Sequence, residues 1–371
     1  MMSAELRGHM VNAMRDSNIE LLRIVAMLSI VAHHYVVHST VWSLFDPVHP
    51  TVNSVFLWLW GMWGKTAINV FVLITGYFMC QSRLTARRYL KILFQVVFYS
   101  WVMWLVLAAC GYETLSWGGA VKRLFCHDIL IGQNRGFVQA FLWMYLLIPA
   151  LNAYLRGASR RNLYCTLGVL VAMFSLCGTF LNANVYHHVF WYAVLYLVGA
   201  AIRMYPFEWM GRNKICVLLL AVSVVAAWCS VVGLNFLAYW RGRPTWYPHT
   251  YVADSHKVLA FTCALFAFLV FRNWKLPQSK FVNAVAATTF GVFLIHDASD
   301  GMRKWLWQDF LDVPGAYSLA PWALIGYSVM VMFGVFAACS VLDYLRIRLV
   351  ERPLFGLWTS ISLKTTKPRR S

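Results

Sequence analysis

Long apolar runs separated by short polar stretches make up most of the chain. Ten runs are long enough to cross a bilayer, which takes about 20 mostly apolar residues in a helix. They span residues 19–38, 62–80, 89–110, 137–155, 163–182, 188–204, 214–238, 257–272, 284–304 and 322–350. Polar residues interrupt the second and ninth runs, and residues 54–62 form a separate apolar piece typical of a membrane interface. The pattern predicts an all-α polytopic membrane protein with about ten transmembrane helices.

The lysines and arginines predict the orientation of these helices. With the N-terminus inside, 22 of the 32 basic residues fall in the inner segments. Short loops rich in Lys and Arg stay in the cytoplasm, so both termini are expected there. We divide the chain into a cytoplasmic segment (1–18), a transmembrane domain (19–357) and a basic cytoplasmic tail (358–371) that lies near anionic lipid. The first run lacks a cleavage site and is expected to stay as an anchor.

Composition supports a membrane protein and argues against several other classes. Only 12% of the residues are charged, whereas 60% are apolar. The net charge of +18 is spread over short clusters between apolar runs, so we expect membrane topology and not nucleic-acid binding to explain it. The nine cysteines lie mostly inside apolar runs and include no CxxC pair. Neither a disulfide framework nor a metal site is therefore expected.

Charged and titratable residues inside the first run are the main functional signal. Arg23 and His34 are 11 residues apart, which places them on almost the same face of a helix and roughly 16 Å apart along its axis. His38 follows one turn later on that face, whereas His33 points to a different one. A buried charge is costly in a membrane, and imidazole is a suitable general base near neutral pH. Two other interpretations stay open: Arg23 reaching the inner headgroups, and His34 as a hydrogen-bonded core histidine.

The next run and the loop after it hold further candidates. Asn69 and Thr75 are polar residues in an apolar setting, and we favour helix packing over catalysis for Thr75 and for Gly76. A basic group follows, made of Arg83, Arg87, Arg88 and Lys91. It fits ordinary cytoplasmic charge, and it also fits a binding patch for a phosphate-bearing cytosolic ligand.

Three later stretches hold isolated polar or aromatic residues. Trp143 lies in the fourth run, and His296 lies in the ninth run just before Asp297. Glu351 lies near the end of the last run, where we expect it to pair with a neighbouring arginine.

Together these features resemble the membrane acyltransferase-3 family over roughly residues 18–357. IELLRIVAMLSIVAHHY matches the family's Arg-x10-His through Arg23 and His34, and INVFVLITGYFM is similar to its second motif through Asn69 and Gly76. The basic group, Trp143, the FLIH sequence and the terminal ERP follow in the family's order. The chain departs from the pattern in three places: Asn69 where aspartate is frequent, Thr75 for serine, and Lys91 for arginine.

The resemblance implies a membrane O-acyltransferase of the cell (plasma or inner) membrane. It implies acetyl-CoA as the donor and a hydroxyl of an envelope polysaccharide or glycolipid as the acceptor. His34 is then the expected base, Arg23 holds the donor, and the basic group binds the phosphates of acyl-CoA. The main alternative is a transporter or flippase of a lipid-linked sugar, with the same polar residues along a pathway. Tryptophans and tyrosines in the outer loops fit either sugar stacking or interfacial anchoring.

Overall fold

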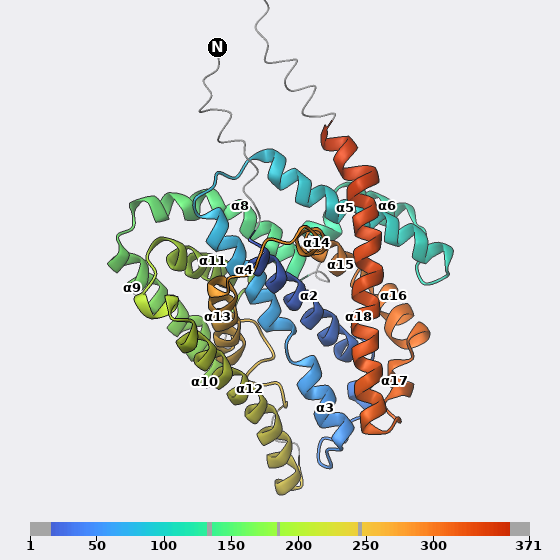
Figure 1. The fold of residues 1–371 in the computed structure, drawn as a ribbon. Coiled ribbons are helices and arrows are strands. Elements are labelled where there is room, and N and C mark those ends of the chain that lie inside the picture. Colours follow the sequence, from blue (N-terminus) through green and yellow to red (C-terminus); the bar gives the residue numbers. More distant parts are fainter. Residues whose placement is uncertain (1–15, 132–135, 184–185, 244–246, 357–371) are drawn as a thin grey trace, which may run out of the picture.

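The protein is described by a computed structural model over residues 16–131, 136–183, 186–243 and 247–356. Every regular element in these ranges is helical (Figure 1). Seven helical stretches are long and apolar enough to cross a membrane. They are α2 (Ser17–Val37), α3 with α4 (Val52–Gly61 and Gly64–Met79), α5 (Ala86–Ala109), α8 (Gly136–Gly157), Arg160–Phe180 (α9, η2 and α10), α12 (Asn213–Arg241) and Pro321–Gly356, which contains α18 (Pro321–Arg346) and η5 (Ile347–Glu351).

Three further apolar regions accompany these spans. The pair Lys280–His296 and Asp300–Phe310 is bent by 96° and forms an eighth span if it is counted as one. It contains α14 (Lys280–Ala286), α15 (Thr289–His296), α16 (Asp300–Arg303) and the π-helix η4 (Lys304–Phe310). Two apolar helices are shorter, α11 (His188–Met204) and α13 (Val258–Asn273). The all-α membrane fold is confirmed, while the count of ten and the sides of the termini stay predictions.

Short elements connect the long ones. They are η1 (Val41–Leu44), α6 (Trp117–Leu124), α7 (His127–Leu130), η3 (Glu208–Gly211) and α17 (Val313–Ala316). One boundary differs from the expectation. Residues 54–62 are not a separate interfacial piece, because α3 continues into α4 within a single 28-residue stretch, Val52–Met79. Most of the N-terminal segment 1–18 and the whole of the tail 358–371 lie outside the described residues.

Helix α2 lies in the middle of the molecule, beside α4, with α18 along one edge (Figure 1). It packs against α3, α4, α13, α14, α15 and α18. Apolar side chains on several sides of α2 are buried, among them Leu22, Met27, Ile30 and Tyr35. A helix that is apolar nearly all round is favoured in such a central place, so polar groups on it are surrounded by protein.

Two glycines allow α4 and α11 to pack closely. A Cβ on Gly76 would lie 2.2 Å from the Tyr196 carbonyl oxygen, and one on Gly199 would lie 2.4 Å from that of Leu73. Small residues at such contacts let membrane helices approach through their backbones. Gly76 therefore has the packing role that we favoured.

Candidate active site

A cavity of about 410 Å³ opens between the C-terminal half of α2 and the N-terminal ends of α4, α8 and α11. The residues before α13 and the bend after α15 complete its wall. Its polar and charged lining consists of His33, His34, His38, Lys65, His188, Tyr192, Tyr247, His249, Ser255, Asp297 and Arg303. Pockets that hold small molecules range from about 300 to 1,000 Å³. The cavity is thus large enough for a sugar-sized ligand and carries five imidazoles.

His34 of α2 is buried and forms a hydrogen bond with His296 at the end of α15. The two ring nitrogens, Nδ1 of His34 and Nε2 of His296, are 2.9 Å apart. The other nitrogen of His296, Nδ1, is 2.5 Å from the Val292 carbonyl oxygen. A carbonyl oxygen only accepts, so His296 carries its proton on Nδ1 and accepts at Nε2. His34 must then donate from Nδ1, which leaves its Nε2 with a free lone pair on a ring that lines the cavity.

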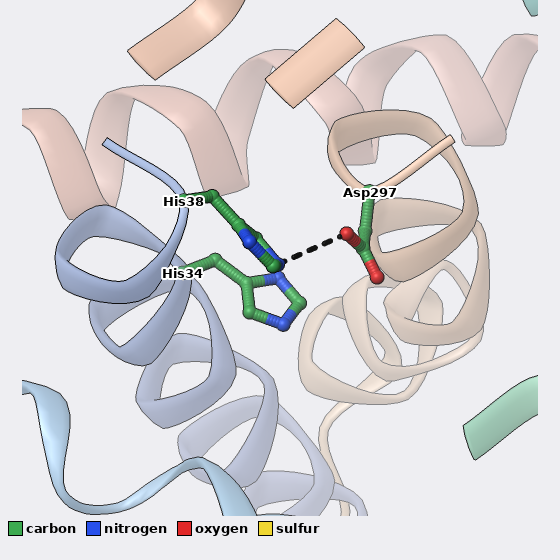
Figure 2. Close-up of side chains that lie close together, drawn as sticks. All are labelled: His34, His38 and Asp297. Carbon is green, nitrogen blue, oxygen red and sulfur yellow. Dashed lines mark ion pairs between the residues drawn. The ribbon is translucent and has the colours of Figure 1, made fainter. Parts of the chain in front are cut away.

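Two acidic residues and an arginine extend this group from the bend. Asp297 Oδ1 lies 3.2 Å from His38 Nε2 and 2.6 Å from Arg303 Nε. Arg303 also pairs with Asp300 at 2.7 Å. Figure 2 shows His34 and His38 projecting from α2 toward Asp297. The cavity face of α2 is therefore joined to the bend by charge-assisted bonds.

His34, His38 and Asp297 form a group that could hold a metal ion, since one donor atom of each lies within 4.8 Å of the others. Two imidazoles and a carboxylate suit zinc. Arg303 already supplies a positive charge to this carboxylate, so the arrangement is accounted for without a metal.

The neighbouring His33 differs from the expectation. It was expected to point to a different face, but its ring also lines the cavity. His33 Nδ1 lies 2.5 Å from the carbonyl oxygen of Gly61, between α3 and α4. Consecutive helix residues such as His33 and His34 differ by about 100° in direction, and in a wide cavity both directions can reach a wall.

Arg23 lies on α2 toward the other end, and it is not part of the cavity lining. Its side chain is one-third exposed, and its Nε is 3.9 Å from Glu20. Arg23 and Arg88 both act electrostatically on Tyr145 of α8. Arg23 therefore lies on the first half of α2, away from the cavity that His34 lines. Its assignment as a catalytic residue stays a prediction.

The four basic residues at 83–91 have different surroundings. Arg83, Arg87 and Arg88 are exposed, although Arg87 donates to the Phe355 carbonyl and Arg88 to the Arg83 carbonyl. Lys91 instead pairs with Glu351 at 2.7 Å. Three of the four are thus exposed at the surface, and Lys91 takes part in an ion pair.

Glu351 belongs to a buried polar cluster between α5 and α18. As expected, it pairs with an arginine, Arg346, at 2.7 Å. Arg346 also pairs with Asp343, which accepts a hydrogen bond from Tyr99. Each carboxylate oxygen of Glu351 binds a cation, Lys91 or Arg346, so its contacts are those of a structural residue.

The remaining candidates also have structural partners. Asn69 is fully buried, donates to the Ser255 carbonyl and accepts from Trp191. Thr75 donates to the Phe71 carbonyl of its own helix. Trp143 is 42% exposed and donates to the Leu130 carbonyl. Of these three, only Asn69 supports the site, because Ser255 lines the cavity.

Sequence reasoning did not identify Lys65, His188, His249 or Arg303 as site residues. Their positions at helix starts and in loops give no periodic signal. His249 illustrates the environment. It donates from Nε2 to the Trp58 carbonyl, and burial lowers its pKa to about 4 despite that bond.

The comparisons with known proteins agree with this structure. A profile of the acyltransferase-3 family, described as an acyltransferase domain, matches residues 16–343. No curated protein and no solved structure matches the chain. The profile includes α2, the cavity and the bend that carries His296. With its apolar helices, the chain therefore belongs to the acyltransferase-3 family and is a multi-pass membrane acyltransferase.

Proposed function

We propose that the protein moves an acetyl group, or another acyl group, from cytosolic acyl-CoA to a sugar hydroxyl. The acceptor is an envelope polysaccharide or a lipid-linked glycan at the outer face of the cell membrane. The observation that carries this proposal is the His34–His296 pair, which leaves a basic nitrogen on the wall of a sugar-sized cavity.

In the proposed reaction the acceptor hydroxyl enters the cavity beside His34. Nε2 takes the proton from the hydroxyl as its oxygen attacks the thioester carbonyl. The carbon–sulfur bond breaks, and the thiolate of CoA leaves with a proton returned from the imidazolium. His296 holds the imidazole in the required tautomer and orientation throughout, as the carboxylate does in hydrolase triads.

Arg23, Arg83, Arg87 and Arg88 are the proposed donor-binding residues. Guanidinium groups pair well with phosphate, and CoA carries several phosphate charges. Arg23 and His34 are separated by roughly 16 Å along α2. The extended pantetheine arm of CoA is suited to such a gap, with its phosphates at the arginines and its thioester near His34.

The decisive experiment compares His34→Gln with the wild type in proteoliposomes that contain radiolabelled acetyl-CoA. Glutamine retains a hydrogen-bonding side chain but is not a base, so acetyl transfer to envelope glycan should fall 10²-fold to 10⁴-fold. His49→Ala is the matched control, because His49 is exposed and outside the cavity lining. Wild-type transfer by His34→Gln would contradict the assignment of the base. Movement of glycan across the membrane without acetylation would favour the transporter instead.

A further inference from the structure

Among the residues that the structure describes, the charged side chains that line the cavity do not balance. Two are cationic, Lys65 and Arg303, and one is anionic, Asp297. Arg303 pairs with both Asp297 and Asp300. The remaining cation is Lys65, the second residue of α4.

Lys65 has no hydrogen bond or ion pair with any residue that the structure describes. Its charge still acts on two histidines of the same cavity, His33 and His188. Asp254 also acts on His188, but it does not line the cavity and it is followed three residues later by Lys257. A half-buried ammonium without a counter-ion is unfavourable unless an anion joins it.

Two helices add to the positive potential. Helices α8 and α11 begin at the cavity, with Gly136 and His188 in its lining. The N-terminal end of a helix carries a partial positive charge and free N–H groups. These ends strengthen the effect of Lys65, which is the only one of these features that carries a full charge.

We infer that the acceptor is anionic, with a carboxylate or phosphate that pairs with Lys65 while its hydroxyl faces His34. This inference rests on the proposed function, since it names the substrate class of the same cavity. Lys65 projects from α4, and His34 from the adjacent face of α2, so one sugar residue in about 410 Å³ contacts both walls. The anion fixes the orientation of the sugar and thereby selects which hydroxyl reacts.

Binding of simple sugars tests the inference without relying on acyl transfer. Saturation-transfer NMR on the full chain in detergent, at constant ionic strength, compares methyl β-D-glucuronide with methyl β-D-glucoside. A charge-assisted bond should make the glucuronide bind about tenfold more tightly to the wild type. Glucose 6-phosphate in the same assay distinguishes a preference for phosphate from one for carboxylate.

Variants then assign the preference to one side chain. In Lys65→Gln the dissociation constants of glucuronide and glucoside should become nearly equal, whereas Lys65→Arg should keep most of the tenfold difference. Lys280→Gln, a change at an exposed lysine of α14, should leave the difference intact. Unchanged binding of the glucoside shows that Lys65→Gln is folded. If this variant does not fold, the comparison of the two sugars on the wild type and on Lys65→Arg still tests whether the cavity prefers an anion.

Several outcomes would overturn the inference. Equal binding of both sugars to the wild type is one, and a preference that persists in Lys65→Gln is another. A third is weaker binding of acetyl-CoA in Lys65→Gln, because Lys65 would then serve the donor. Lys65-dependent glucuronide binding without any acetyl transfer would support the anionic site and refute the proposed function.

Discussion

Replacing His296 with leucine should remove the partner that orients His34, the proposed base. His296 is fully buried, and its Nε2 accepts the hydrogen bond from His34. Leucine is apolar and cannot accept this bond. The Nδ1–H of His34 then has no partner in a buried environment, and its ring can rotate or change tautomer.

The size of the effect follows from that one bond. Leaving a buried donor without a partner costs about 1–3 kcal/mol. If that cost raises the free energy of the transition state, kcat falls by about fivefold to 150-fold, since each 1.36 kcal/mol is tenfold. The KM values for donor and acceptor should change less than about twofold, because His296 is absent from the cavity lining.

Two variants separate positioning from packing. His296→Gln keeps an oxygen that accepts from His34, so it should recover part of the lost kcat. Ile295→Val is the matched control, since Ile295 is a buried residue of the same helix, outside the cavity lining, and has no side chain that can hydrogen-bond. The assay is acetyl transfer by the purified protein in proteoliposomes, over a range of pH. A wild-type kcat in His296→Leu would refute the reasoning, as would an equal loss in Ile295→Val.

Three further predictions concern binding, stability and pH. Arg88→Ala should raise the KM for acyl-CoA about threefold to fivefold at low salt. The difference in KM between variant and wild type should shrink at high salt, because exposed charges are screened. A salt-independent KM would count against the donor site. Glu351→Gln removes the carboxylate that pairs with buried Arg346 and should lower the free energy of unfolding by about 2–4 kcal/mol, measured by thermal unfolding in detergent. Burial lowers the pKa of His249 from 6.5 to about 4, so the unfolded state binds more protons and the free energy of unfolding decreases as pH falls from 6.5 toward 4. His249→Asn should therefore reduce the decrease in unfolding temperature over this pH range. An unchanged pH dependence in His249→Asn would show that other groups cause the decline.

The helices could be predicted from the sequence because apolar runs of bilayer length have few other uses. All ten predicted runs overlap helices of the structure. The differences arise where the chain breaks its own pattern. Residues 54–62 are too short to span a bilayer alone, so their continuation through Trp63 into α4 could not be inferred. The bend after His296 was read as part of one straight run, although polar residues at Asp297 and Asp300 interrupt it.

The sequence predicts an arrangement of site residues only along α2, while His296 and Asn69 are isolated candidates. The helical repeat places Arg23, His34 and His38 on one face, and this needs no knowledge of any other segment. Partners far apart in the sequence lie beyond such reasoning. His34 and His296 are separated by 262 positions, and their contact depends on how α15 packs on α2. Lys65 is a single cation in an outer segment until the fold places it in a cavity.

In the proposed reaction, the position of α2 explains how one helix can serve both substrates. That reaction requires a charged, water-soluble donor and a sugar acceptor to approach from opposite sides while their reacting atoms meet. Arg23 lies in the first half of α2 and outside the cavity lining, whereas His34 lies in its second half and lines the cavity. Because protein surrounds α2 on several sides, neither group has to face lipid, where a charge is costly. The buried His34–His296 bond would then hold the proposed base at the depth where the two substrates meet.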